Sequence, residues 1–175
     1  MKIIAVAAVT AGGKTTVVNE LKKRLQNSQS LHFDDYTFEG EVDNFYEWVN
    51  AGADYYSVWN LKPLEEDILK IKEAGICDYL ILDYPFAYCH DTINPYIDTA
   101  FFIDTPLDIA LARRILRDMS DATGDDIRND LETYLKYARI SFIQMQKDIL
   151  PSSDYVIDGT HTVDEIANEI IAKIL

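Results

Sequence analysis

The chain of 175 residues is long enough for one domain with a sizeable core, and 48% of its residues are hydrophobic while 26% are charged. This balance is typical of a folded globular protein and excludes a largely disordered chain. The formal net charge of −14 argues against nucleic acid as a partner, because phosphate backbones are bound by basic surfaces.

No apolar run is long enough to span a bilayer, so we expect no membrane partner. The apolar stretch at the N-terminus is too short for a signal peptide, and we expect residues 1–8 to form a strand. Two cysteines, Cys77 and Cys89, form neither a CxxC motif nor a metal-binding spacing. This usage favours a reducing compartment, and we expect a cytoplasmic protein.

Short apolar runs alternate with helical patterns along the chain, which is typical of a parallel sheet covered by helices. Because no linker or internal repeat divides the chain, the sequence predicts a single α/β domain. The expected strands are residues 2–8, 31–34, 79–83, 100–104 and 155–158. The expected helices are residues 14–25, 63–74, 106–118, 126–150 and 163–174.

The strongest motif lies between the first expected strand and the first expected helix. The segment Ala8-Val9-Thr10-Ala11-Gly12-Gly13-Lys14-Thr15-Thr16 matches the Walker A pattern G-x-x-x-x-G-K-[ST], with alanine at the first glycine position. Small residues let backbone N–H groups close around phosphate oxygens, and the new helix aims its positive end at them. Alanine at position 8 is tolerable only if its backbone does not need a positive φ.

Within this loop, Lys14 would reach the β- and γ-phosphates of ATP, and the Thr15 hydroxyl would ligate Mg²⁺. The alternative is a plain glycine turn with a solvated lysine. Strand, loop and helix follow one another in the required order, which favours nucleotide binding. The predicted nucleotide-binding residues of the loop are Ala11, Gly12, Gly13, Lys14, Thr15 and Thr16.

Several expected strands end in an acidic residue, at the sheet edge where α/β proteins bind their ligands. Asp34 and Asp35 follow the second strand, and phosphoryl transfer needs a carboxylate that orients the acceptor hydroxyl and takes its proton. We expect Asp34 to be this base and a candidate Mg²⁺ ligand, unless both aspartates only cap a turn. Asp83 ends the third strand like a Walker B acid, and it would either hold Mg²⁺ through water or cap the turn into Pro85.

Three of the few arginines, Arg113, Arg114 and Arg117, fall within one expected helix. Arg113 and Arg117 are four residues apart and share a face near the C-terminal end of that helix. They could simply favour the helix dipole and nearby aspartates. They could instead form a lid whose guanidinium groups clamp the transferring phosphates. The residues alone leave both interpretations open.

These motifs together resemble the uridine kinase and nicotinamide riboside kinase group of P-loop kinases, related to phosphoribulokinase, almost from end to end. The resemblance is carried by the loop at 9–16, by His32-Phe33-Asp34-Asp35-Tyr36 and by the lid-like helix at 112–118. Asp83 stands where the group has a glutamate. The resemblance implies a three-layer α/β/α sandwich with a five-stranded parallel sheet, ATP as donor, Mg²⁺, and a nucleoside-like acceptor.

The same resemblance implies a helical lid at about 113–128, with Arg113, Arg114 and Arg117 directed at the phosphates. Residues 134–137 and Asp158-Gly159-Thr160 also look like riboside kinase segments. The second of these lies by the adenine in the group, so Gly159, Thr160 and the adjoining His161 are predicted nucleotide-binding residues.

Two departures from the group concern the lid and the acceptor. Uridine kinases usually carry another arginine shortly after the lid helix, whereas residues 120–126 are acidic here and only Arg128 could substitute for it. The group also places an aspartate on the ribose hydroxyls. In the expected acceptor-binding segment, about residues 36–62, the alternatives are Ser57, Asn60 and the nearby Asp54.

Aromatic side chains are concentrated between residues 36 and 59. They could stack on a flat base or pack as a small cap over the sheet. They are Tyr36, Phe38, Phe45, Tyr46, Trp48, Tyr55, Tyr56 and Trp59. The histidines His32, His90 and His161 show no metal-binding spacing, and apart from His161 we expect them to be structural or surface residues.

We therefore expect an ATP- and Mg²⁺-dependent kinase that phosphorylates a hydroxyl of a nucleoside-like small molecule. One alternative is a kinase for a sugar, a vitamin precursor or a nucleotide. Another is an ATP-binding regulator without turnover. The sequence leaves the oligomeric state open, a homodimer included.

Overall fold

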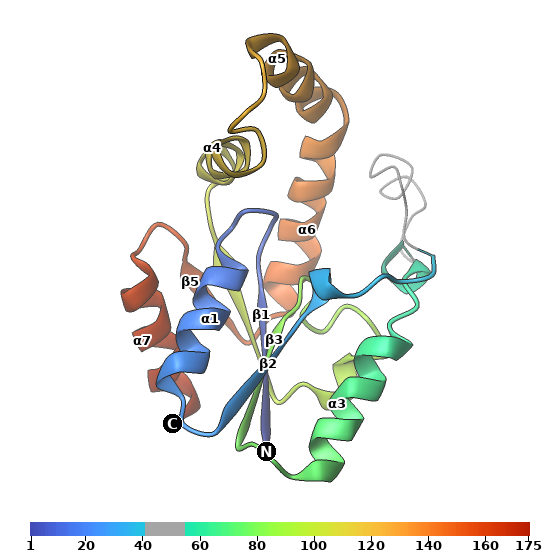
Figure 1. The fold of residues 1–175 in the computed structure, drawn as a ribbon, viewed down its shortest axis with the longest axis vertical. Coiled ribbons are helices and arrows are strands. Elements are labelled where there is room, and N and C mark those ends of the chain that lie inside the picture. Colours follow the sequence, from blue (N-terminus) through green and yellow to red (C-terminus); the bar gives the residue numbers. More distant parts are fainter. Residues whose placement is uncertain (41–54) are drawn as a thin grey trace.

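The computed structural model describes residues 1–40 and 55–175. Five parallel strands form one sheet in the order β2-β3-β1-β4-β5 (Figure 1). The strands are β1 Lys2–Ala7, β2 Ser28–His32, β3 Tyr79–Asp83, β4 Thr99–Asp104 and β5 Tyr155–Asp158. The main helices are α1 Lys14–Arg24, α3 Lys62–Ala74, α4 Leu107–Asp118, α5 Gly124–Thr133, α6 Arg139–Ser152 and α7 Val163–Ile174.

Helices cover both faces of the sheet, so the central strands are apolar and buried between their end residues. On one face, Val18 and Leu21 of α1 and Ile170 of α7 pack in a core with the sheet. On the other face, Ile68 of α3 and Ile149 of α6 belong to a second core. Figure 1 shows α1 and α7 on one side of the sheet and α3 on the other. The predicted three-layer α/β/α fold is confirmed.

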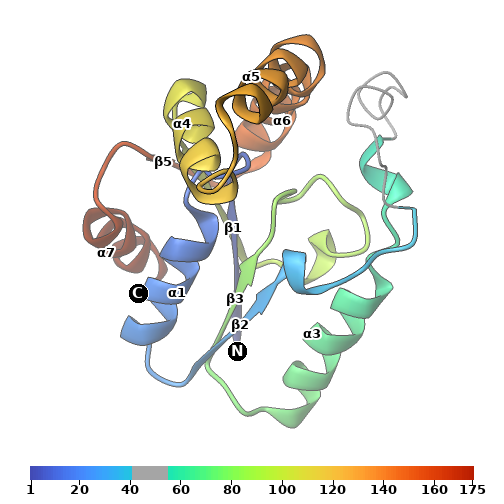
Figure 2. The same cartoon turned by 45° about the horizontal axis from the view of Figure 1, so that its top comes forward.

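The first strand lies in the middle of the sheet, where it pairs with β3 on one side and β4 on the other. Its C-terminal end leads directly into the Walker-type loop. The helices α4, α5 and α6 gather at this same end of the sheet, as Figures 1 and 2 both show. A site at this edge is therefore built from the strand ends below and the helices above.

The second strand differs from the prediction at both ends, since it spans Ser28–His32 and stops before Asp34. It is an edge strand whose residues are all half-buried, and backbone pairing with β3 holds it. Polar residues such as Ser28 and Ser30 are compatible with that position, so hydrophobicity alone did not reveal it. Asp34 and Asp35 lie in the short 3-10 helix Phe33–Asp35 that follows.

The single helix expected at 126–150 is also wrong. A π-helical turn at Tyr134–Ala138 separates α5 from α6, and the N–H of Arg139 donates to the carbonyl of Tyr134. The helix α5 begins earlier than expected, because Thr123 and Asp126 form a reciprocal capping box at its start. No described helix combines the length and apolar character that crossing a membrane requires.

Candidate active site

The loop between β1 and α1 has the backbone geometry of an anion-binding site. Ala11 and Gly13 both have left-handed conformations, with φ of 57° and 101°, and the N–H of Gly12 donates to the carbonyl of Val9 at 2.9 Å. The N-cap Gly13 has no capping side chain. The first N–H groups of α1 therefore remain available to an anion, and the helix dipole favours negative charge at this point.

Space in the loop explains its residue types. A Cβ on Gly12 would lie 2.8 Å from the Cβ of Ala8 and 2.8 Å from the carbonyl oxygen of Val9, so only glycine fits. Ala8 is fully buried and has no positive φ, which meets the condition for alanine at the first glycine position. Ala11 is an L-residue in the left-handed region and stores about 1 kcal/mol or more of strain, as residues at functional sites often do.

A hydroxyl and a carboxylate meet beside this loop. Thr15 Oγ1 donates to Asp83 Oδ2 at 2.5 Å, and Asp83 is almost completely buried at the end of β3. Oxygen donors of this kind suit Mg²⁺, which keeps several waters and binds few protein groups when phosphates complete its shell. Among the residues that the structure describes, no group of three or more His, Cys, Asp or Glu is placed to hold a metal ion. The two oxygen donors of Thr15 and Asp83, next to an anion-binding loop, fit Mg²⁺ bound together with phosphate.

A cavity of about 550 Å³ lies at this edge of the sheet and joins three parts of the molecule. It is lined by the loop, by residues of α4, and by Asp34 with several apolar side chains. Of the residues predicted from the sequence, it brings together Ala11, Gly12, Gly13, Lys14, Thr15, Thr16, Asp34, Arg113, Arg117, Gly159 and His161. Asp83 reaches it through Thr15, whereas Arg114 and Thr160 are not among its lining residues.

Two arginines of α4 face this cavity. A Cβ on Gly13 would lie 4.0 Å from Arg113 Nη1, so this guanidinium group lies over the phosphate-binding loop. Arg117 donates to Asp118 through Nε at 2.5 Å and Nη2 at 2.9 Å. The hydrogen bond with Asp118 raises the pKa of Arg117, burial opposes it, and the charges of Asp118 and Asp34 add to the rise. Asp34 is thus within electrostatic reach of Arg117 on α4.

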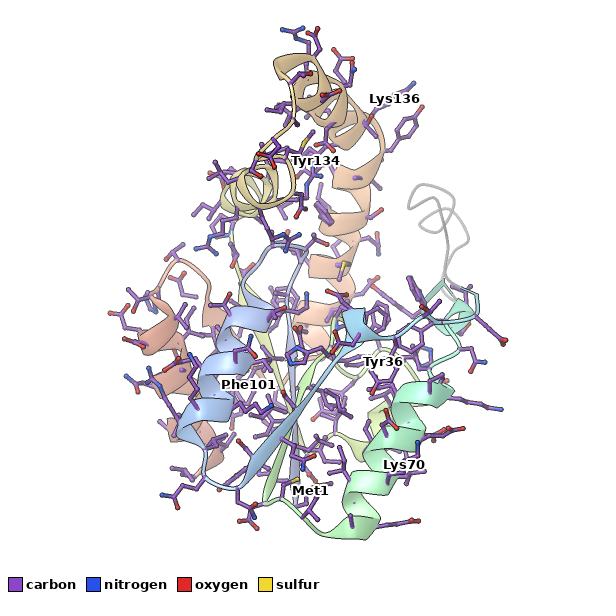
Figure 3. All side chains as sticks on the ribbon, viewed as in Figure 1. Met1, Tyr36, Lys70, Phe101, Tyr134 and Lys136 are labelled. Atoms are coloured by element: carbon purple, nitrogen blue, oxygen red, sulfur yellow. The ribbon has the colours of Figure 1, made fainter. Side chains whose placement is uncertain are left out.

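Arg114 has a different environment from its two neighbours. It donates two hydrogen bonds to Asp130 of α5, one of them from Nη1 at 3.1 Å, and its guanidinium carbon lies 6.0 Å from the centre of the Tyr134 ring. Tyr134 lies among the upper helices in Figure 3, at the start of the π-helical turn. Arg114 therefore fastens α4 to α5. Arg128 pairs with Asp125 at 2.7 Å and is likewise not a lining residue.

Thr105 connects the loop after β1 with the loop after β5, a role that the sequence pattern did not indicate. Its buried Oγ1 donates to the carbonyl of Gly12 at 2.8 Å, and the N–H of Gly159 donates to the carbonyl of the preceding Asp104 at 3.0 Å. A hydroxyl residue directly after a strand end was the only signal. The loop after β5 is closed locally, since Thr160 donates to Asp158 through its N–H and its hydroxyl.

Replacing Gly159 with alanine is expected to destabilise the protein by about 1–3 kcal/mol, because the new Cβ would lie 2.0 Å from Thr105 Oγ1 and 2.7 Å from Thr105 Cα. Each kcal/mol corresponds to about 2–4 °C in Tm for a chain of this size. Gly124→Ala is the control, because a Cβ there meets nothing within 4 Å. Equal melting temperatures for the two variants would contradict the close packing of Gly159 on Thr105.

Aromatic residues form the far wall of the cavity. Phe33, Trp59 and Phe86 line it, and the ring centres of Phe33 lie 5.7 Å from Trp59 and 5.4 Å from Phe86. Phe38 and Tyr56 are buried in the same core. Among the described residues of the predicted acceptor segment, Phe38, Tyr56 and Trp59 therefore pack in the core, and of these three Trp59 lines the cavity.

Other described residues that the sequence suggested for acceptor binding do not line the cavity. Tyr36 lies beside α3 and donates to Asp67 at 3.0 Å (Figure 3). Asn60 accepts from the N–H of Lys62, and neither it nor Ser57 lines the cavity. Phe45, Tyr46, Trp48 and Asp54 lie outside the described residues.

Comparison with known proteins gives similar sequences over most of the chain. The chain is 24% identical to the uridine kinase of Borrelia hermsii, and the aligned region covers 92% of this chain and 88% of the relative. It is 26% identical to the uridine kinase of Staphylococcus epidermidis, covering 89% and 86%. Uridine-cytidine kinase B of Dictyostelium discoideum is 25% identical, covering 98% and 82%. No protein-family model matches the chain.

Solved structures share the fold. Shikimate kinase from Bacteroides thetaiotaomicron superposes with a TM-score of 0.59 at 14% identity, covering 99% of this chain and 98% of the other. Deoxyadenosine kinase from M. mycoides gives a TM-score of 0.51 at 15% identity, covering 98% of each. The chain thus has the fold of the P-loop kinases and resembles the uridine kinases over most of its length.

Proposed function

We propose that this protein is an ATP-dependent kinase that transfers the γ-phosphate to a hydroxyl group of a nucleoside-like acceptor. The observation that carries the proposal is the shared cavity, in which the phosphate-binding loop, two lid arginines and the carboxylate of Asp34 face one space. The names of the similar proteins support a nucleoside as acceptor.

Each part of the site has a role in this reaction. The loop amides and Lys14 hold the phosphates, and Arg113 and Arg117 stabilise the charge that spreads over the phosphoryl oxygens in the transition state. Asp34 orients the acceptor hydroxyl and takes its proton. Thr15 and Asp83, with Asp34 as a further candidate ligand, would hold Mg²⁺. That ion supplies neutralisation of the β- and γ-phosphate charge when bound.

We assign the nucleotide base and the acceptor to different parts of the cavity. The base of ATP is assigned to the part that Gly159 and His161 line together with Val163 and Ile166. The acceptor is assigned to the part that the aromatic residues Phe33, Trp59 and Phe86 line. A flat base can stack on rings of this kind, which supports a nucleoside over a simple sugar.

The test is a panel of ribonucleosides, deoxyribonucleosides, sugars and vitamin precursors, each incubated with the protein, ATP and Mg²⁺. Acceptor-dependent ADP release with a nucleoside, absent in Lys14→Ala, is the expected result. ADP release only with a sugar or a vitamin precursor would show that the acceptor belongs to that class and is not a nucleoside. ATP binding without release for any acceptor would support a regulator in place of a kinase.

A further inference from the structure

The end of β2 carries a histidine whose contacts continue the Thr15–Asp83 pair. His32 and Asp83 are directly opposite partners in the β2–β3 ladder, so their side chains lie on the same face of the sheet. His32 Nδ1 lies 3.2 Å from Asp83 Oδ2, and His32 Nε2 lies 3.2 Å from Ser30 Oγ. Four side chains, Ser30, His32, Asp83 and Thr15, thus form one hydrogen-bonded row.

The direction of these hydrogen bonds follows from chemistry. An ionised carboxylate only accepts, so both the Thr15 hydroxyl and the Nδ1–H of His32 donate to Asp83 Oδ2. The second ring nitrogen, Nε2, lies next to the hydroxyl of Ser30. A hydroxyl can donate or accept a hydrogen bond, so this contact holds the ring whether or not Nε2 carries a proton. No other described residue donates to the carboxylate of Asp83, so its Oδ1 remains available.

Because Asp83 is buried, its carboxylate depends on these hydrogen bonds for its orientation. The side chain of Asp83 is only 5% exposed and that of His32 is 21% exposed, so water contributes little to holding the carboxylate. The torsion that turns a carboxylate about its axis is broad, and its orientation depends on hydrogen-bond partners. Without the donor on His32, only the Thr15 hydroxyl would orient Asp83.

We propose that His32 is a positioning residue for magnesium binding. It holds Asp83 with Oδ2 toward Thr15 and Oδ1 directed to the metal side of the site. This role rests on the proposed function, because a kinase needs the metal; the metal affinity itself can be measured without any kinase activity. Partners that orient a ligand group contribute about 10–100-fold to metal affinity.

Two substitutions separate positioning from packing. In His32→Asn the short side chain places an amide N–H close to the position of Nδ1, so the donor to Asp83 is kept. In His32→Gln the longer side chain places its amide near the position of Nε2, so the contact with Ser30 is kept and that with Asp83 is lost. Both remove the ring, so any general effect of its loss is common to the two.

The measurement is the affinity for Mn²⁺ in the presence of ADP, followed by electron paramagnetic resonance without any acceptor. We expect His32→Gln to bind Mn²⁺ about 10–100-fold more weakly than wild type, and His32→Asn to stay within about threefold. Asp83→Ala sets the value for loss of the carboxylate. The affinity for ADP without metal should be unchanged in both histidine variants.

Equal Mn²⁺ affinity in wild type and His32→Gln would overturn the proposal. So would a loss of metal-free ADP binding in both histidine variants, because that result indicates a packing role. Since neither measurement involves an acceptor or turnover, failure of the proposed kinase activity would be recognised separately in the acceptor panel.

Discussion

Replacing Asp34 with asparagine is expected to lower kcat for acceptor phosphorylation by about 10²–10⁴-fold, the usual contribution of a general base. The amide has nearly the same shape as the carboxylate but cannot take the hydroxyl proton. Asp34 is exposed and forms no hydrogen bond with any described residue, so the fold should be unaffected. The measurement is steady-state kinetics with the acceptor found in the panel, and KM for ATP should change little.

Asp35→Asn provides a matched control, because Asp35 lies in the same 3-10 helix, is exposed and does not line the cavity. It should keep near wild-type activity. If raising the Mg²⁺ concentration restored Asp34→Asn, the carboxylate would act as a metal ligand and not as the base. If Asp34→Asn kept more than about a tenth of wild-type kcat, the assignment of the base would be wrong.

The second large effect is expected at Lys14. Lys14→Ala should lower kcat by about 10²–10³-fold, because it removes a fixed positive charge from the phosphates where negative charge is redistributed in the transition state. Lys14 is in none of the ion pairs that the described residues form, so its removal leaves no uncompensated partner. The variant should therefore melt near the wild-type temperature.

Charge is a separate concern in a protein with a formal net charge of −14, because loss of any lysine weakens its attraction for ATP. Lys22→Ala controls for this, since Lys22 is exposed on the same helix α1, away from the cavity. Both variants should be compared by kcat and by KM for ATP. A Lys14→Ala rate within about threefold of the Lys22→Ala rate would show that Lys14 does not take part in transfer.

Much of the fold could be predicted because its signals are local. The strands at the centre of the sheet are continuous apolar runs, and the Walker-type loop is a contiguous motif between a strand and a helix. The second strand could not be bounded in this way, because an edge strand held by backbone pairing needs little apolar surface. The π-helical turn at Tyr134–Ala138 leaves the helical pattern nearly unchanged, so its sequence indicates an unbroken helix.

The site residues that the sequence did not reveal depend on long-range partners. Arg114 has the same local setting as Arg113, yet its guanidinium pairs with Asp130 on another helix. His32 looks isolated in the sequence, and its contact with Asp83 follows only from the register of two strands 51 residues apart. Thr105 reaches the carbonyl of Gly12 across 93 residues. Spacing along the chain contains no information on such pairs.

The central place of β1 also determines when the site can assemble during synthesis. Its two neighbours, β3 and β4, begin at Tyr79 and Thr99, so the first strand made has no partner strand until almost half of the chain exists. At about 5–20 residues per second, a ribosome needs about 5–20 s to synthesise the first hundred residues. During that time the apolar strand and the phosphate-binding loop remain without their native contacts. Pairing between such distant segments is intrinsically slow, so the apolar first strand stays exposed for much of the synthesis.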